Sequence, residues 1–81
     1  MGSHTLLPLE LVAAGQWAEV EDIGGEPSWV SRLAELGVCV GSRLRVVRQG
    51  RPCLLQIGSC RLSLRDELGT QILVRPLPVS P

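Results

Sequence analysis

Apolar and polar residues alternate along several short segments of this chain, which is the pattern of strands that bury one face. Five segments have the length and composition of strands: residues 16–23, 43–48, 51–57, 60–64 and 72–74. In the first of them, alternation places Trp17 and Glu19 on one face, and Ala18, Val20 and Asp22 on the other. Glycine and proline residues separate the segments. The sequence therefore predicts five short strands.

One segment has helical spacing instead. Residues 26–36 read "EPSWVSRLAEL", and their apolar positions recur three and four residues apart, at Trp29, Val30, Leu33 and Leu36. Pro27 suits the first helical turn, Ser28 is an alternative cap, and Gly37 follows where a left-handed residue ends a helix. We expect this apolar stripe to pack on the core; a docking groove is the alternative.

Residues 58–59, Gly-Ser, fit a two-residue hairpin loop between the third and fourth predicted strands. Such a loop would pair Ile57 with Cys60 and place Cys53 opposite Leu64. Cys53 and Cys60 would then be too far apart along the hairpin to form a disulfide.

Three cysteines make an odd number, and no two of them form a C-x-x-C pair. This excludes the usual disulfide frameworks and zinc sites. We expect reduced thiols that fill the core as small apolar side chains, with a metal or redox role as the weaker alternative. The three are Cys39, Cys53 and Cys60.

Short antiparallel strands without a covering layer protect their edges by curling into a barrel. We therefore expect a mainly β fold, a small five-stranded barrel with one short helix. The 81 residues suffice for one domain. We assign it residues 6–75. Residues 1–5 would be a tag remnant or disordered start, and residues 76–81 a proline-rich tail that does not pair inside a sheet.

Charge is balanced overall but uneven along the chain. Residues 1–36 contain six acidic residues and one arginine, whereas residues 37–81 contain seven arginines and two acidic residues. The two halves could steer a charged partner, or they could neutralise each other in space. The strand over 43–48 carries three arginines, at positions 43, 45 and 48, which fit either an anionic partner or a solvated outer face.

The combinations of residues that catalysis needs are not visible in the sequence. The sequence shows no nucleophile–base pair and no phosphate-binding loop, so we expect a binding protein and not an enzyme. Scattered carboxylates and isolated thiols predict no built metal site and no required cofactor, only weak divalent-metal binding at the surface. No run reaches the length of a membrane span and no signal peptide is visible, so we expect a cytoplasmic protein.

Two patches resemble the ferrous-iron transport protein A (FeoA) family. The first is "RLAELGVCVGSRLRVV", residues 32–47, with a helix ending in L-x-x-L-G, a glycine turn and an alternating strand. The second is "GSCRLSLRDELGTQILV", residues 58–74, with an apolar-small-apolar strand and a final I-x-V strand. The opening residues 6–20 are also similar to the start of that family.

The resemblance implies an SH3-like barrel that assists FeoB, a membrane permease with a cytosolic GTPase domain. The family has no agreed catalytic residues. A similar barrel occurs at the end of iron-dependent transcriptional repressors. Their helix-turn-helix and dimerisation parts are not found in this sequence, so a complete repressor is not expected.

Strand alternation puts Leu44 and Val46 inside, so Arg43 and Arg45 must face solvent. Our hypothesis is that part of the permease-docking surface consists of Arg43, Arg45, Arg48, Arg61 and Glu35. The alternative is a small-barrel module that binds nucleic acid or acts in transcription. Because the chain has two tryptophans, no other aromatic residue and zero net charge, we expect no nucleic-acid partner.

Overall fold

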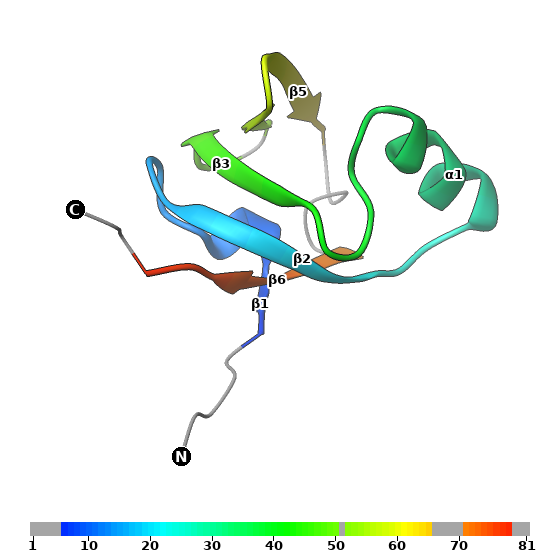
Figure 1. The fold of residues 1–81 in the computed structure, drawn as a ribbon, viewed down its shortest axis with the longest axis horizontal. Coiled ribbons are helices and arrows are strands. Elements are labelled where there is room, and N and C mark those ends of the chain that lie inside the picture. Colours follow the sequence, from blue (N-terminus) through cyan, green and yellow to red (C-terminus); the bar gives the residue numbers. More distant parts are fainter. Residues whose placement is uncertain (1–5, 51, 66–70, 79–81) are drawn as a thin grey trace.

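A single sheet of six antiparallel strands, in the order β1-β6-β2-β3-β4-β5, forms the body of the protein (Figure 1). The structure is a computed structural model that describes residues 6–50, 52–65 and 71–78. Along the chain the elements are β1 (Leu7–Pro8), the 3₁₀ turn η1 (Leu9–Leu11), β2 (Trp17–Ile23), α1 (Pro27–Glu35), β3 (Arg43–Arg48), β4 (Cys53–Ile57), β5 (Cys60–Leu64) and β6 (Ile72–Pro76).

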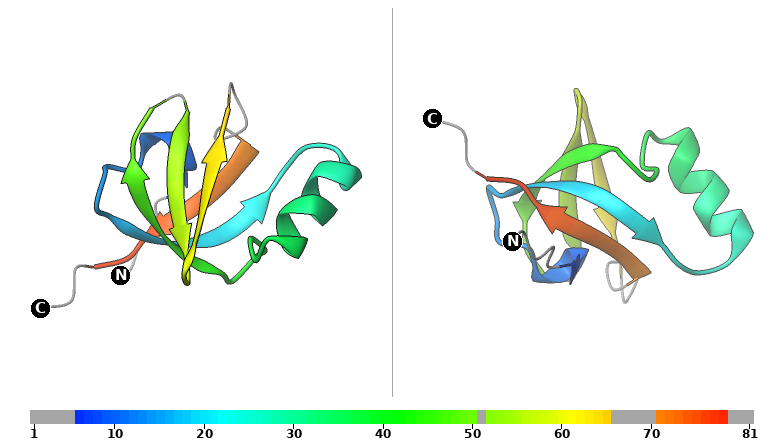
Figure 2. Two further views of the ribbon diagram at one scale, coloured as in Figure 1. Left: turned by 90° about the horizontal axis from the view of Figure 1, so that it is seen from above. Right: turned by 60° about the horizontal axis from the view of Figure 1, so that its bottom comes forward.

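The predicted mainly β architecture with one helix is confirmed, with two changes. The strand number is six, because the opening segment contributes the two-residue β1, in which Leu7 lies opposite Val74. The sheet curls strongly but does not close, since β1 and β5 form its two ends and no pairing joins them within the described residues (Figure 2).

The last strand lies between two N-terminal strands, because β6 pairs with β1 on one side and β2 on the other. Its pairing extends past the predicted strand over 72–74: Pro76 lies opposite Ala18, and the Leu77 N–H donates to the Trp17 carbonyl over 2.9 Å. The pairing therefore extends one residue past the expected domain end at residue 75. Pro76 has β2 on one side, whereas the β1–β6 pairs are at Leu73 and Val74, so the proline does not pair on both of its sides among the described residues.

Among the described residues, thirteen apolar side chains form the buried core inside the curl of the sheet. They come from every strand except β1, from η1 and the residue after it, and from α1 and the residues after it: Leu9, Val12, Ala18, Val20, Leu33, Val38, Leu44, Val46, Cys53, Leu55, Leu64, Ile72 and Val74. The alternation in the sequence predicts this inner face in β3, where Leu44 and Val46 are buried.

Two β-bulges shift the alternation. In β2 the register against β6 changes between Val20 and Asp22, so Asp22 lies opposite Leu73 and is exposed. The prediction that Asp22 shares a face with Val20 is therefore wrong. The extra residue of the bulge, Glu21, carries a carboxylate that bonds to Arg75.

Helix α1 ends in a Schellman motif. Gly37 has a φ of +95°, the Gly37 N–H donates to the Ala34 carbonyl over 3.0 Å, and the Val38 N–H donates to the Leu33 carbonyl over 2.8 Å. The predicted stop at Gly37 is confirmed. At the other end Glu26 is the N-cap residue and makes no side-chain capping bond, so Ser28 does not act as the cap.

The helix stands beside the sheet and does not cover it (Figures 1 and 2). Only Leu33 of the predicted apolar stripe is fully buried. Trp29 packs partly against the core, while Leu36 is 50% exposed. The expectation that the whole stripe packs on the core is therefore wrong, and its outer part lines a groove.

The β4–β5 hairpin has the predicted register: Ile57 pairs with Cys60, and Cys53 lies opposite Leu64. All three cysteines are free, as expected. Only Cys53 is in the core, whereas Cys39 and Cys60 are exposed, so the expectation that all three fill the core is wrong for these two. The described residues do not include four parts of the chain: residues 1–5 (with His4), residue 51, residues 66–70 and residues 79–81.

Candidate docking surface

A row of four side chains crosses the outer face of the sheet from β2 to β5. Trp17 lies opposite Arg45, Arg45 opposite Gln56, and Gln56 opposite Arg61. Their sequence neighbours Ala18, Leu44 and Leu55 are buried, so the row faces away from the core. The two arginines are exposed. The strand register thus brings Arg45 and Arg61 onto one surface.

Trp17 and Arg45 form a close cross-strand pair. The Val46 N–H donates to the Gln16 carbonyl over 3.0 Å, so the hydrogen-bonded position falls one residue away from this pair. Residues at non-hydrogen-bonded positions lie about 4.5 Å apart at their Cα atoms. Trp17 is 46% exposed and therefore adds an aromatic surface beside the arginine. The sequence predicted only that Trp17 shares a face with Glu19, and its cross-strand neighbour is known from the register.

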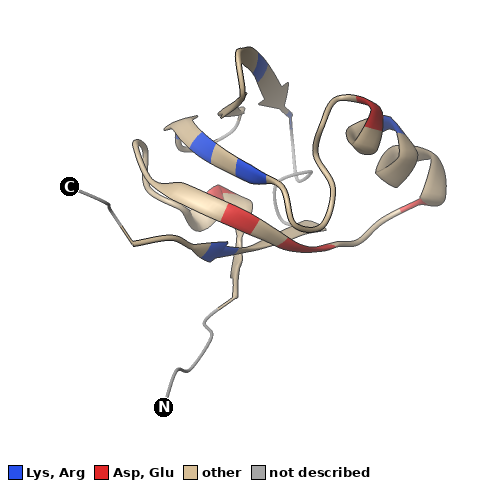
Figure 3. Cartoon of the chain, in the orientation of Figure 1, with Lys and Arg blue, Asp and Glu red and all other residues tan. Residues whose placement is uncertain are grey.

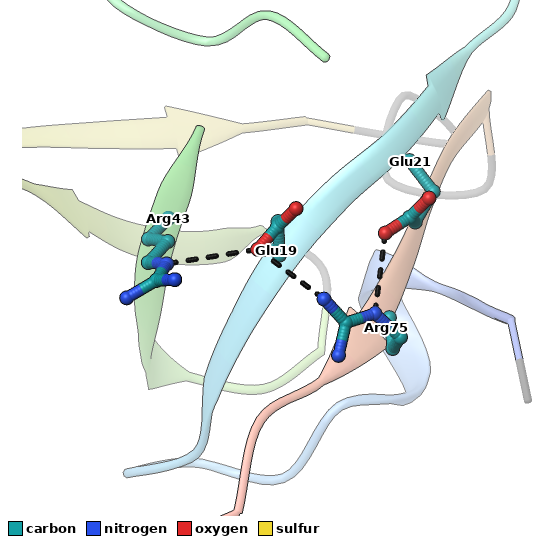
Figure 4. A network of polar contacts seen from close by, with 4 residues as sticks. All are labelled: Glu19, Glu21, Arg43 and Arg75. Carbon is teal, nitrogen blue, oxygen red and sulfur yellow. Dashed lines mark hydrogen bonds and ion pairs between the residues drawn. The ribbon is translucent and has the colours of Figure 1, made fainter. Parts of the chain in front are cut away.

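The next row of the outer face is an ion-pair network across three strands (Figure 4). Glu19 Oε1 on β2 lies 3.6 Å from Arg43 Nε on β3 and accepts a bond from Arg75 Nη2 on β6 over 3.3 Å. Arg75 Nε donates to Glu21 Oε2 over 3.2 Å. Arg43 and Arg75 are thus partly neutralised, and the Arg43 side chain remains 70% exposed.

The second bulge determines where Arg48 lies. Regular alternation would put Arg48 on the same face as Val46, inside the sheet. The register of β3 against β4 instead shifts between Val46 and Arg48, and Arg48 lies opposite Leu54. Since Leu54 alternates with the buried Cys53 and Leu55, Arg48 faces outward with Arg43 and Arg45.

The charges of the two halves of the chain meet in space, but neutralisation is incomplete (Figure 3). Acidic residues of β2 lie beside arginines of β3 and β6 and form the pairs described above. Arg45, Arg48 and Arg61 form no ion pair with another residue in the ranges 6–50, 52–65 and 71–78. Among the described residues, these three side chains are unpaired positive charges on the outer face.

Glu35 is the predicted site residue that does not join this surface. It is the exposed last residue of α1, and the helix stands to the side of the sheet. No hydrogen bond or ion pair connects Glu35 with the four arginines within the described part of the chain.

The described residues offer few side chains that could coordinate a metal ion or react with a bound molecule. The part of the chain that the structure describes brings together no three His, Cys, Asp or Glu side chains that could hold a metal ion. Burial, with a smaller contribution from the negative charge of Glu10, raises the pKa of the Cys53 thiol above its ordinary value. Cys53 is therefore a protonated core side chain at neutral pH.

Residues 7–76 match the FeoA domain family. The chain belongs to the FeoA family. This family is associated with ferrous iron transport and comprises small accessory proteins, not known enzymes. The resemblance inferred from residues 32–47 and 58–74 is thereby confirmed. The sequence matches no curated protein.

Solved FeoA structures have the same fold. FeoA from Chlorobium tepidum is 29% identical, with a TM-score of 0.82 over 93% of this chain and 74% of that one. The crystal structure of an iron uptake regulatory protein, FeoA, is 23% identical, with a TM-score of 0.80 over 90% of this chain and 99% of that one.

A manganese-dependent transcriptional repressor also contains this fold. It is 22% identical to this FeoA protein, with a TM-score of 0.81, and the similarity covers 95% of this chain but 45% of the repressor. At that identity the likeness concerns the fold alone. No helix among the described residues of this FeoA protein is long and apolar enough to cross a membrane.

Proposed function

We propose that this FeoA protein is a cytoplasmic accessory protein of bacterial ferrous iron uptake, which binds the cytosolic part of the FeoB permease and modulates it. It would reach the inner membrane only through that partner. Family membership over residues 7–76 supports the link with ferrous iron transport. The docking surface we propose is the outer face around Arg43, Arg45, Arg48 and Arg61.

One observation carries the choice of surface: three of these arginines have no acidic partner among the described residues. Arg45 and Arg48 lie on β3 and Arg61 lies on β5, with β4 between them, and all three point outward, whereas Glu19 already offsets Arg43. An exposed positive surface accelerates encounter with an acidic partner surface and makes binding dependent on salt. Glu35 stays a predicted contact at the end of α1, separate from this surface.

Calorimetric titration of the protein into the cytosolic part of FeoB tests the proposal, at low and moderate salt, with and without guanine nucleotide. We expect affinity in the micromolar range, about −8 kcal/mol, that weakens as salt increases. Absence of binding in every nucleotide state and at low salt would contradict docking on the cytosolic part.

Charge reversal locates the surface. We expect the double variant Arg45→Glu, Arg61→Glu to weaken binding at least about tenfold at low salt, because two unpaired positive charges become negative. Arg32→Glu on α1 is the matched control, since it reverses an exposed arginine outside the outer face. If Arg32→Glu weakened binding and the double variant did not, the outer face would not be the docking surface.

Trp17 beside Arg45 favours one second candidate, a module that binds single-stranded nucleic acid. An exposed aromatic ring next to a cation is the minimal combination for base stacking and phosphate contact. A gel-shift titration with mixed-sequence oligonucleotides tests it. A shift abolished by Trp17→Ala would support the nucleic-acid function, and no shift at low salt would exclude it.

We further propose that the protein needs no resident cofactor and binds divalent metal only weakly, at surface carboxylates. Equilibrium dialysis against Mn²⁺ as a stand-in for Fe²⁺ measures this directly. Weak binding that Glu19→Gln or Asp22→Asn reduces would fit surface carboxylates. Stoichiometric, tight binding would contradict the proposal.

A further inference from the structure

A second surface lies at the opposite edge of the sheet from β1, where β5 faces α1. A groove of about 580 Å³ runs between them. Its apolar lining comes from one side of the helix and one side of the strand: Trp29, Leu33, Leu36, Leu62 and Leu64. Sites of about 300–1,000 Å³ are large enough to bury a small ligand or a few residues of peptide. The exposed outer part of the helix stripe belongs to this groove.

The strand on one side of the groove has a backbone edge that no strand of the described residues pairs with. β5 is the last strand in the order of the sheet, and within residues 6–50, 52–65 and 71–78 it pairs with β4 alone. Ile57 and Cys60 close a two-residue hairpin loop, so they form a hydrogen-bonded pair, and Leu55–Leu62 and Cys53–Leu64 follow by alternation.

The residues between these pairs direct their backbone groups away from β4. The N–H and C=O groups of Arg61 and Ser63 therefore point to the open edge. No other backbone hydrogen bond joins either residue to a described part of the chain. An edge of this kind can accept an additional strand from a partner.

The positive charges around the groove indicate that the additional strand would be acidic. Arg32 on α1 and Arg65 after β5 both line the groove, and neither forms an ion pair within the described residues. Between Cys60 and Arg65 the chain contains two arginines and no acidic residue. A second copy of β5 would meet this edge with like charge, whereas an acidic segment would be attracted.

Trp29, which lines the groove, also carries an unsatisfied polar atom. Its indole Nε1 is buried and has no hydrogen-bond partner among the described residues. A buried donor without a partner is destabilising, so structures rarely retain one. Trp29 also borders a second hollow of about 370 Å³, which Gly25 and Gln71 line as well.

We propose that the groove between α1 and β5 binds an extended acidic segment of a partner protein by β-strand addition. The segment pairs with the Arg61 and Ser63 backbone groups. Its apolar side chains contact Leu36 and Leu62, and its carboxylates lie near Arg32 and Arg65. This inference goes beyond docking on the permease and does not depend on it, because the groove and the outer face are formed by different side chains.

Amide hydrogen exchange, measured by NMR with a short capped peptide in which glutamate alternates with leucine, tests the pairing. Exchange at the Arg61 and Ser63 amides should slow at least about tenfold at saturating peptide, since both become hydrogen-bond donors. The Leu62 amide, already bonded to β4, should change little. A peptide with lysine in place of glutamate should not produce the effect. Unchanged exchange at both edge amides would overturn the proposal.

A variant pair tests the groove. Leu36→Asp adds a negative charge to the lining, and we expect it to weaken peptide binding at least about tenfold. The control is Val40→Asp, which makes the same change at an apolar residue that is 64% exposed and outside the groove. Both positions are exposed, so circular dichroism should show intact folds. Equal weakening by the two variants would contradict the assignment.

Fluorescence and two further measurements separate the alternatives. Trp17→Phe leaves Trp29 as the one tryptophan of the chain, and its emission should shift to shorter wavelength with the peptide.

Arg45→Glu should keep peptide binding, which distinguishes this site from the outer face. Protection of the edge amides by high protein concentration alone would identify a second copy as the occupant. Protection by an oligonucleotide and not by the peptide would likewise overturn the proposal.

Discussion

Arg75 Nη2 on β6 donates a hydrogen bond to Glu19 Oε1 on β2 over 3.3 Å, across the strand pair that joins the two ends of the chain. The Glu19 carboxylate is shared, since Arg43 lies 3.6 Å away on its other side. The Glu19 side chain is 22% exposed and that of Arg75 31%, so water screens the pair only in part. This carboxylate therefore limits how positive the outer face becomes.

Glu19→Gln should remove that limit at a small cost in stability. We expect the free energy of unfolding to fall by about 0.5 kcal/mol, because partly exposed ion pairs contribute little. Asp22→Asn is the control, because it makes the same change of charge at an exposed residue of β2 that forms no ion pair with another described residue. Urea unfolding measures both. A loss of several kcal/mol for Glu19→Gln would mean that the network fixes the β2–β6 pairing.

Two adjacent glycines before α1 should respond differently to alanine. Gly25 has a φ of +105°, and a Cβ there would collide with Gln71 Oε1 and lie 2.9 Å from Trp29 Cδ1. Gly24 has room, since its nearest contact would be at 3.6 Å. We expect Gly25→Ala to cost about 2 kcal/mol or more and Gly24→Ala about 0.5 kcal/mol. Thermal unfolding compares them, and equal costs would contradict the arrangement at Trp29.

Neighbouring leucines of β4 test the direction of the curl. Leu55 is fully buried, whereas Leu54 is on the outer face opposite Arg48. Leu55→Ala should destabilise the protein by about 2–5 kcal/mol, because it removes buried methyl groups and leaves a cavity. Leu54→Ala should cost about 1 kcal/mol or less. Guanidinium unfolding gives both values, and the reverse order would mean that the β4 register is wrong.

The three thiols should differ in reactivity. Burial and the charge of Glu10 raise the pKa of Cys53, which lowers its thiolate fraction at neutral pH, while Cys39 and Cys60 are exposed. We expect alkylation by iodoacetamide at pH 7 to modify Cys39 and Cys60 and spare Cys53. Raising the pH should increase the Cys53 rate only above the range of an ordinary cysteine. Mass spectrometry of timed samples checks this, and early modification of Cys53 in folded protein would contradict its burial.

Much of the fold could be predicted because it follows from local patterns. Alternation in β3 identifies Leu44 and Val46 as core residues, Gly37 ends the helix through its left-handed backbone, and the loop at residues 58–59 determines the hairpin register. Each of these features depends on residues close together in the sequence.

The two bulges and the position of the helix could not be predicted in this way. A bulge inserts one residue against a partner strand, so the outward direction of Arg48 and Asp22 depends on β4 and β6. The apolar pattern of α1 predicts an apolar stripe, but it does not show how much of the sheet is available to cover that stripe. Leu36, at the end of the stripe, is therefore exposed although the pattern favours burial. The surface with Trp17 and Arg45 likewise required the pairing of strands distant in the sequence.

The insertion of β6 between β1 and β2 also has a consequence for synthesis in the cell. Ile23 pairs with Ile72 and Leu7 with Val74, so the first strands gain their shared neighbour only from the end of the domain. While the nascent chain is still held in the ribosome, the β2–β3–β4–β5 meander can form, but its other side is open. The domain is therefore expected to complete folding only once β6 has left the ribosome, in one late step dominated by contacts distant in sequence.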